Sequence, residues 1–570
     1  MTKLYMGFDA GTQSVKVAVY DEQFRLVASH SLPTTLHYPQ PGWVQMNCDE
    51  FLNITVECMK KTVEDVKGKG YSPSDIAAVM GDGIICGICG VDENGKAVTP
   101  YINYLDSRTQ EDVDAINALD LDIWGRETGN PQANCMFPAM FARWFIANSE
   151  AFRQKGVKFV HNAPYILMNL AGLKGEDAFI DWGTMSGWGL GYKVEKKEWS
   201  DEQLEILGID KKYMPRILKP WDIVGGVCKE MAARTGLAEG TPVCAGAGDT
   251  MQSMLGAGVF GAGQGVDVAG TCAMFCVSTK GIVPELSKKG AGLIFNSGTL
   301  ENTYFYWGFI RTGGLSLRWF KDNICQKSDD PLYYRVLSEK AEEVPAGCNG
   351  VVFLPYLTGG TGSFKNASGM FLNMTLDDDQ FVQWRAVLEA IGYDYMEITD
   401  IYRAAGVDLN RITVTEGGSR DSLWNQIKAD MLDATVVRYR NAGGAVVTNC
   451  VFAAKAAGHV TDVIPLLEKT IVKDAEYTPN ADNAELYRRL STSRRRLSKT
   501  ICRAPTRVCL RCARPSPASI GNRLSGTRPL PRACRPPHNN VSGIKHEHQN
   551  PNPDLGGGRR GNDGRQRPAA

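Results

Sequence analysis

The chain has 570 residues, of which 43% are hydrophobic and 22% are charged, as in folded globular proteins. This composition excludes a fibrous or wholly disordered protein, and the length predicts two to four domains. No stretch approaches roughly 18 consecutive apolar residues, so we expect no membrane-spanning helix, and the N-terminus does not resemble a signal peptide. The 16 cysteines are scattered in apolar contexts, which predicts reduced thiols in a cytoplasmic protein.

The first predicted unit is a β-hairpin at the N-terminus. Residues 4–8 are apolar and predict a strand, DAGT follows at 9–12, and the alternation over 15–20 predicts the return strand. Backbone N–H groups in such a glycine turn can cradle phosphate oxygens, and Asp9 can hold a magnesium ion through water. An ordinary hairpin turn would use the same residue types, because Asp-x-Gly is common turn chemistry.

In the middle of the chain a carboxylate follows a predicted strand. Residues 242–245 form a short apolar run, 246–248 form a small-residue turn, and Asp249 precedes a helical pattern over 251–255. An Asp at a strand's carboxyl end and a helix start occupies the place where ligands bind in α/β folds. This stretch alone favours an N-cap role for Asp249 over a catalytic one, because caps are more common.

Two further glycine segments complete the pattern. Residues 265–276, GVDVAGTCAMFC, repeat the strand–Asp–Gly-Thr–strand order of residues 7–18, GFDAGTQSVKVA, with one extra residue. Residues 415–420, TEGGSR, lie between a predicted strand and a predicted helix, which is a favoured place for nucleotide contact. We therefore predict an internal duplication, with two similar domains facing each other across a cleft and offering glycine turns to a nucleotide's phosphates.

The C-terminal segment differs in charge from the rest of the chain. Residues 491–570 carry 17 Lys and Arg against 3 Asp and Glu, a net charge of +14, whereas residues 1–490 carry −14. Three interpretations are open: a basic arm for nucleic acid, a zinc module built on Cys509 and Cys512, or sequence read out of frame, which we favour. The segment shows no helical or strand period, so we predict disorder from residue 491 onward.

In the order of these segments the chain resembles the FGGY family of carbohydrate kinases, which share the fold of actin, hexokinase and the Hsp70 ATPase. The matching segments are FDAGTQSVKVAVYD, PGWVQMNCDEF, YLDSRT, DWGTMSGWGL, AGAGDTMQSMLGAG, AGTCAMF, GGLSLRWF and EGGSRDSLWNQIKADML. The segments PGWVQMNCDEF and IAAVMGDGIICGICGVD look most like those of xylulose kinases. The resemblance implies an α/β protein with two ribonuclease-H-like domains, at residues 1–248 and 249–490, and an interdomain cleft.

The resemblance also implies roles for individual residues and the cofactors ATP and Mg²⁺. Asp249 matches the general base that accepts the proton of the attacking sugar hydroxyl, and Asp9 matches the carboxylate that holds Mg-ATP. The positions beside the nucleotide match Gly11, Thr12, Gly270, Thr271, Gly314, Arg318, Gly418 and Ser422. The positions that face the sugar match Ile85, Cys86, Asp106 and Arg108.

Sugar-side segments depart from the family pattern. Xylulose kinases carry Gln-Met-His-Gly where this chain has GIICG at 83–87, so Cys86 stands at the His position and Ile85 at the Met position. Asp82 either replaces the lost sugar contact or is a turn residue in Gly-Asp-Gly, and the sequence favours the turn. The family loop GERTP is replaced by TGGTGS at 358–363. These departures affect the expected sugar more than the expected reaction.

The favoured function is ATP-dependent phosphorylation of a small sugar, with D-xylulose to D-xylulose 5-phosphate first. Within the class, the alternatives are another ketose, a polyol or a sugar acid, such as ribulose, erythritol or gluconate. An alternative from another class is a catalytically weak sugar- or nucleotide-binding regulator, against which the intact Asp249 argues. The expected partners are the sugar and ATP, without membrane or nucleic acid, and the assembly we consider is a homodimer.

Overall fold

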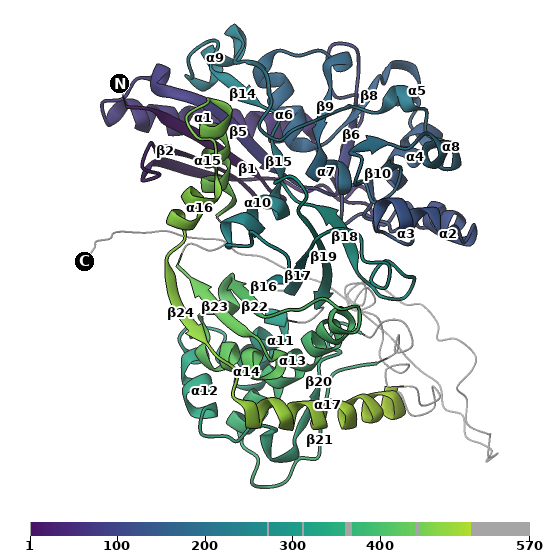
Figure 1. Cartoon of the computed structure of the whole chain (residues 1–570), viewed down its shortest axis with the longest axis vertical. Coiled ribbons are helices and arrows are strands. Elements are labelled where there is room, and N and C mark those ends of the chain that lie inside the picture. Colours follow the sequence, from purple (N-terminus) through teal and green to yellow (C-terminus); the bar gives the residue numbers. More distant parts are fainter. Residues whose placement is uncertain (1, 271–272, 311–312, 360–366, 441–443, 503–570) are drawn as a thin grey trace, which may run out of the picture. The chain divides into compact units, whose positions relative to one another are not determined.

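Two seven-stranded sheets organise the chain. The computed structural model describes residues 2–270, 273–310, 313–359, 367–440 and 444–502 (Figure 1). In the first sheet the strands follow the order β13-β14-β5-β1-β2-β3, with β15 beside β5. Its strands are β1 (Leu4–Ala10), β2 (Ser14–Asp21), β3 (Leu26–Pro33), β5 (Ile76–Gly83), β13 (Ile223–Gly226), β14 (Pro242–Cys244) and β15 (Ala247–Gly248). Apolar residues of β1, β2, β5 and the first helix form one buried cluster.

The second sheet repeats the pattern at the centre of the first. Its order is β18-β19-β17-β16-β22-β23-β24. Its strands are β16 (Gln264–Ala269), β17 (Ala273–Thr279), β18 (Ile294–Ser297), β19 (Tyr304–Ile310), β22 (Arg411–Thr415), β23 (Thr435–Tyr439) and β24 (Lys473–Tyr477). In each sheet an antiparallel hairpin, β1–β2 or β16–β17, lies beside a parallel strand, β5 or β22. The two predicted hairpins therefore occupy equivalent places.

Helices and short strands complete the described part of the chain. The helices are α1 (Cys48–Gly68), α2 (Gln110–Ala118), α3 (Ile123–Thr128), α4 (Pro138–Asn148), α5 (Glu150–Lys155), α6 (Asn162–Ala171), α7 (Trp182–Ser186), α8 (Asp201–Leu207), α9 (Lys229–Thr235), α10 (Asp249–Gly256), α11 (Gly313–Trp319), α12 (Tyr333–Ala341), α13 (Gln380–Ala404), α14 (Ser422–Leu432), α15 (Ala445–Ala456), α16 (Ile464–Thr470) and α17 (Ala481–Cys502). The short strands are β4 (Gln45–Met46), β6 (Gly87–Val91), β7 (Tyr101–Asn103), β8 (Lys158–Val160), β9 (Phe179–Asp181), β10 (Tyr192–Lys193), β11 (Glu198–Trp199), β12 (Arg216–Leu218), β20 (Val352–Leu354) and β21 (Met370–Leu372). No helix in the described ranges is long and apolar enough to cross a membrane.

Helix α15 comes late in the chain but packs against the first sheet, beside β1 and β5 (Figure 1). Glycines allow this close approach. A Cβ at Gly7 of β1 would lie 2.4 Å from the carbonyl oxygen of Val446, and a Cβ at Gly256 of α10 would lie 3.0 Å from the backbone nitrogen of Gly444. A helix from the stretch 249–490 thus belongs to the packing of the first sheet, and the expected domain bounds stay predictions.

Helix α17 corrects one expectation. Residues 491–502 are helical, so the disorder predicted from residue 491 onward is wrong for this part. Arg494 donates to Asp394 (3.1 Å) on α13, and Arg495 donates to Asp400 (2.6 Å) on the same helix. The run looked too basic to fold, because the acidic residues that pair with it lie about 100 residues upstream. The residues from 503 to 570 lie outside the described part, so the three interpretations of the tail stay predictions.

Candidate active site

Three carboxylates meet at one edge of the first sheet. Strands β1, β5 and β15 run parallel, and Asp9 is the register partner of Asp82, which is also the partner of Ala247. Asp249 follows β15 directly as the first residue of α10. The carboxyl ends of parallel strands are where ligands bind in α/β folds. The side chain of Asp9 is 18% exposed, whereas Asp82 is fully buried.

The structure corrects the interpretation of Asp82. It lies within strand β5 and not in a turn. The flanking glycines, which suggested a turn, serve close packing instead. A Cβ at Gly81 would lie 2.0 Å from the ring of Phe8, and a Cβ at Gly83 would lie 2.6 Å from the side-chain oxygen of Asn162. Asp82 is therefore a buried strand residue beside Asp9, and the turn expected from Gly-Asp-Gly is wrong.

The N-cap interpretation of Asp249 is also wrong. Gly248 occupies the N-cap position of α10 and makes no side-chain cap. Oδ1 of Asp249 accepts hydrogen bonds from the backbone N–H of Thr250 (2.6 Å) and from its hydroxyl (3.1 Å). The general-base role implied by the resemblance stays a prediction, and one oxygen of the carboxylate bonds a first-turn N–H of α10 although Asp249 is not the N-cap residue.

Burial controls the electrostatics of the three acids. Burial and, to a smaller extent, the charge of Asp9 raise the pKa of Asp249, and hydrogen bonds from Thr250 lower it, so that the pKa lies at about 7. Burial, with the charges of Asp9 and Asp249, raises the pKa of Asp82 well above its ordinary value. Burial also raises the pKa of Asp9, against the opposite effect of Lys16, whose Nζ lies 3.9 Å from Oδ2 of Asp9. A carboxylate with a pKa near 7 suits a general base at neutral pH.

Ile85 and Cys86 lie close to Asp249. A Cβ at Gly248 would lie 2.3 Å from Cγ2 of Ile85, so this glycine lets the two segments touch. The thiol of Cys86 donates to the carbonyl oxygen of Gly187 (3.7 Å), and burial raises its pKa, so it is a neutral, weak donor. Both side chains are buried. They give this side of the site an apolar character.

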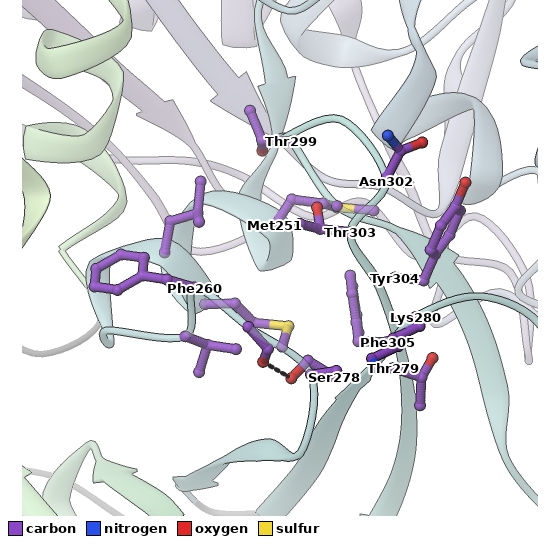
Figure 2. A pocket seen from close by; sticks show the side chains of 16 residues that line it. Met251, Phe260, Ser278, Thr279, Lys280, Thr299, Asn302, Thr303, Tyr304 and Phe305 are labelled. Carbon is purple, nitrogen blue, oxygen red and sulfur yellow. Dashed lines mark hydrogen bonds between the residues drawn. The ribbon is translucent and has the colours of Figure 1, made fainter. Parts of the chain in front are cut away.

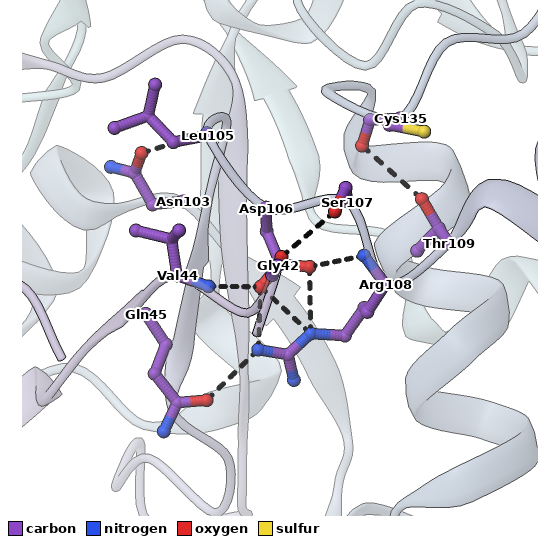
Figure 3. A network of polar contacts seen from close by, with 10 residues as sticks. All are labelled: Gly42, Val44, Gln45, Asn103, Leu105, Asp106, Ser107, Arg108, Thr109 and Cys135. Carbon is purple, nitrogen blue, oxygen red and sulfur yellow. Dashed lines mark hydrogen bonds and ion pairs between the residues drawn. The ribbon is translucent and has the colours of Figure 1, made fainter. Parts of the chain in front are cut away.

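Asp106 and Arg108 form an ion pair of their own (Figure 3). Oδ2 of Asp106 accepts from the backbone N–H of Val44 (2.6 Å), and both carboxylate oxygens accept from Arg108. The guanidinium lies 3.9 Å from the ring centroid of Trp43 and 4.9 Å from that of Trp144. Protein donors thus engage both oxygens of Asp106, and the pair fixes the segment around Val44. Contact of either residue with a sugar stays a prediction.

Glycines from three segments meet at the end of the second hairpin. The backbone N–H of Gly314 donates to the carbonyl oxygen of Gly270 (2.9 Å). A Cβ at Gly418 would lie 2.8 Å from Cβ of Ala269. The predicted nucleotide positions Gly270, Gly314 and Gly418 are therefore brought together. Thr271, the remaining predicted residue of this turn, lies outside the described part of the chain.

The other predicted nucleotide residues are more spread out. Gly11 closes the first hairpin by donating to the carbonyl oxygen of Ser14 (3.1 Å), and the hydroxyl of Thr12 accepts from Asn103 (3.4 Å). Ser422 is the first residue of α14, and Arg318 is exposed on α11. The exposed position of Arg318 on α11 does not test whether its side chain contacts a bound nucleotide, so this role stays a prediction.

The aspartates of the two hairpins have different surroundings. Asp267 of the second hairpin is buried, accepts from the hydroxyl of Tyr395 (2.5 Å) and pairs with the equally buried Lys428 (2.5 Å). Asp9 of the first hairpin instead lines a cavity of about 580 Å³, together with Lys16. Of the two aspartates at equivalent places, one therefore lines a cavity and the other is paired with a buried cation.

A second hollow lies beside the far end of α10 (Figure 2). Its volume is about 190 Å³, and its lining is mostly apolar, with Met254, Phe260 and Phe305 among its walls. Its hydroxyls are engaged with the protein: Ser278 donates to the carbonyl oxygen of Gly261 (2.5 Å), and Thr299 donates to Gln252 (2.9 Å). None of the residues predicted to act in catalysis or binding lines it.

Comparison with known families decides the class of the protein. Residues 4–256 match the N-terminal domain of the FGGY family of carbohydrate kinases, and residues 265–457 match its C-terminal domain. The chain belongs to the FGGY family of carbohydrate kinases. It is a sugar phosphotransferase of two-domain α/β fold, and its family uses ATP. The residues of the glycine turns and the three carboxylates lie within the matched ranges.

Named relatives of this FGGY kinase divide between two activities. It is 24% identical over 508 residues to a gluconokinase of Bacillus licheniformis, covering 86% of this chain and 94% of the relative. It is 27% identical over 506 residues to a xylulose kinase of Escherichia coli, covering 85% and 98%. Its fold matches the crystal structure of a xylulose kinase from Rhodospirillum rubrum with a TM-score of 0.79 at 24% identity, covering 88% and 99%.

Proposed function

We propose that this FGGY kinase transfers the γ-phosphate of ATP to a neutral small sugar, D-xylulose first, giving D-xylulose 5-phosphate. The observation that carries the proposal is the start of α10. There Asp249 stands at the carboxyl edge of the first sheet, and burial raises its pKa to about 7. Asp249 accepts the proton of the sugar hydroxyl as that oxygen attacks the γ-phosphate. A cytoplasmic location and a homodimeric assembly belong to the same proposal.

Phosphoryl transfer asks for positioning and charge neutralisation more than for covalent chemistry. In this proposal the phosphates lie against the glycine turn at Gly11 and Thr12 and against Gly270, where the absence of a side chain on glycine lets them approach the backbone. Gly418, packed against Ala269, keeps the loop before α14 close to the second turn. Arg318 on the exposed face of α11 and Ser422 at the start of α14 contact the nucleotide in this proposal.

Asp9 is the residue that fits a magnesium ion. Its carboxylate is partly exposed and lines a cavity of about 580 Å³. Within the described ranges, no group of three or more His, Cys, Asp or Glu side chains could hold a metal alone. Mg²⁺ is commonly held by one or two carboxylates, several waters and the substrate's phosphates, which matches a site with one available Asp. When bound, the ion neutralises charge on the transferring phosphate.

The chemistry of the sugar side supports a neutral substrate over a sugar acid. Ile85 and Cys86 offer an apolar wall and one weak donor. Among the residues placed on this side, the one cation, Arg108, is paired with Asp106 and stacked on two tryptophans. A gluconate carboxylate would need a cation or several donors to replace its hydration. A ketose or polyol needs hydrogen-bond partners for its hydroxyls but no cation.

A coupled ADP-release assay tests the substrate. D-xylulose, D-ribulose, erythritol and D-gluconate are each offered with Mg-ATP. We expect the neutral sugars to stimulate ADP release, D-xylulose most strongly, and gluconate to have little effect. Stimulation by gluconate above all others would overturn the neutral-sugar proposal. Tight ATP binding without stimulation by any of them would favour the sugar- or nucleotide-binding regulator.

A further inference from the structure

Four buried polar side chains form a continuous hydrogen-bonded chain behind the carboxylates. The hydroxyl of Thr299 donates to Oε1 of Gln252 (2.9 Å), whose Nε2 donates to Oδ1 of Asn449 (2.6 Å). Nδ2 of Asn449 donates to Oδ2 of Asp82 (2.7 Å). All four residues are at most 1% exposed. The chain runs from the loop after β18, through α10 and α15, to β5.

Asn449 is the point at which three elements meet. Besides Asp82, its amide donates to the carbonyl oxygen of Phe8 (2.8 Å), the residue before Asp9 on β1. Its oxygen is bonded to Gln252, which lies one helical turn after Asp249 on α10. One amide group therefore contacts each of the three elements that carry the site's carboxylates.

The hydrogen bonds of Asn449 do more than satisfy buried polar atoms in the core. The charges of Asp9 and Asp249 raise the pKa of Asp82, and the charge of Asp9 raises that of Asp249, so these carboxyls lie close enough to interact and neutral donors are needed to fix where they lie. Asp82 has one oxygen bonded to Asn449, while the other oxygen, Oδ1, is buried without a neutral donor among the described residues, and a hydrogen bond between the carboxyls of Asp82 and Asp9 needs one of them protonated. A buried polar atom left unpaired is expensive, and such atoms call for an explanation in native structures. Asn449 is thus a neutral donor that holds one of the two oxygens of Asp82.

We propose that Asn449 is the positioning residue of the active site. It fixes the carboxylate of Asp82, the end of β1 and the start of α10 in one arrangement, in which Asp249 meets the sugar hydroxyl. Gln252 and Thr299 extend the support to the second sheet's loop. The inference rests on the proposed function, because it assigns Asn449 an effect on the transfer step and not on binding.

Single substitutions along the hydrogen-bonded chain, from Asn449 to Thr299, test this role. Asn449→Leu removes all three hydrogen bonds of the amide, Gln252→Leu removes the next link, and Thr299→Val removes the last. A misplacement of about 1 Å at a reacting group can lower the rate ~100-fold. We expect kcat to fall ~10- to 100-fold for Asn449→Leu, less for Gln252→Leu and least for Thr299→Val, while KM for ATP and for the sugar changes less than about threefold.

Asn130 offers a matched control. It is equally buried, donates to the carbonyl oxygen of Phe295 (3.1 Å) and to the hydroxyl of Tyr192 (3.3 Å), and accepts from the N–H of Phe295 (2.8 Å). Asn130→Leu therefore removes as many hydrogen bonds away from the carboxylates. We expect a similar loss of thermal stability for the two Asn→Leu variants and a fall in kcat for Asn449→Leu alone.

A double variant distinguishes hydrogen bonds that act together from hydrogen bonds that act independently. If the links act as a unit, Asn449→Leu with Gln252→Leu loses no more kcat than Asn449→Leu alone. Additive losses, equal losses of kcat in Asn449→Leu and Asn130→Leu, or a rise of KM that accounts for the whole effect would overturn the proposal. If Asn449→Leu does not fold, Gln252→Leu against Thr299→Val carries the comparison.

The same variants distinguish this inference from the proposed function. A wild-type enzyme that no sugar stimulates contradicts the proposed function. In that case the variants are compared in sugar-independent ATP hydrolysis, where the order Asn449→Leu, Gln252→Leu, Thr299→Val still tests the positioning role. An order that survives there supports the inference, and its absence overturns it.

Discussion

At the scale of single residues, Asp249 combines a place at a helix start with a raised pKa, which is the basis of the general-base role proposed for it. Gly248 takes the N-cap position without a side-chain bond, and Asp249 bonds the first-turn N–H of Thr250 with one carboxylate oxygen. Burial raises its pKa to about 7, where an ordinary Asp would be a much weaker base. The raised pKa carries a cost in stability, because the folded protein buries a group that is charged in water at neutral pH.

That cost gives a prediction with a defined sign. The pKa of Asp249 is about 7 in the folded protein against 3.8 as the ordinary value. The folded state therefore binds more protons between these two pH values, and stability falls as pH rises through this window. We expect Asp249→Asn to be more stable than the wild type at pH 8, by up to about 4 kcal/mol, with the difference shrinking towards pH 4.

Thermal melts at pH 4, 6 and 8 measure this effect. Asp329→Asn, at an exposed position, is the control and is expected to melt like the wild type at each pH. A difference between Asp249→Asn and the wild type that grows as the pH falls would contradict the assignment of a raised pKa to Asp249.

At the scale of elements, the docking of α15 on the first sheet depends on glycines. A Cβ at Gly7 would lie 2.4 Å from the carbonyl oxygen of Val446 and 3.1 Å from Cβ of Asn449. Since backbone cannot step aside as a flexible side chain can, we expect Gly7→Ala to destabilise the fold by about 1–3 kcal/mol. Denaturant unfolding measures the change.

Gly68 provides the comparison for Gly7. It ends helix α1, and a Cβ there would meet nothing within 4 Å. Gly68→Ala is expected to leave stability unchanged or to raise it by up to about 1 kcal/mol. Equal effects of the two alanines would show that α15 does not press on β1 as described.

Local patterns predicted some elements of the site well and others poorly. The Asp and Gly-Thr residues between alternating strands predicted both hairpins, because the turn residues and the strands are neighbours in the sequence. Asp82 was misjudged, because glycines on both sides of an Asp are typical of a turn, while here they admit Phe8 and Asn162. Asn449 carries no local signal at all, since its partner Asp82 is 367 residues away.

At the scale of the whole molecule, the order of the motifs predicted the two-domain kinase fold, and the family comparison confirms it. The net charge led to the wrong expectation that residues 491–502 are disordered. Charge counting treats Arg494 and Arg495 as solvated, whereas α13 presents Asp394 and Asp400 to them. Partners brought together by folding are invisible to a window of sequence, which is also why the identity of the sugar cannot be read from the motifs.

Two truncations test the extent of the folded unit. A chain ending at residue 490 loses the buried Arg494 and its bonds to α13 and is expected to be less stable by about 1–3 kcal/mol. A chain ending at residue 502 keeps them and is expected to match the full chain in melting temperature and sugar-dependent ADP release. A large loss in the longer truncation would contradict the predicted disorder of the remaining tail.

The central claim is that Asp249 is the general base of a sugar kinase. The most direct test is the sugar-dependent rate of ADP formation in the wild type and in Asp249→Asn, with the Kd for ATP measured on both by calorimetry. Loss of the base is expected to lower kcat by ~10²- to 10⁴-fold while the Kd for ATP stays within about threefold. A variant that keeps near wild-type kcat, or that loses activity only because it no longer binds ATP, would contradict the account.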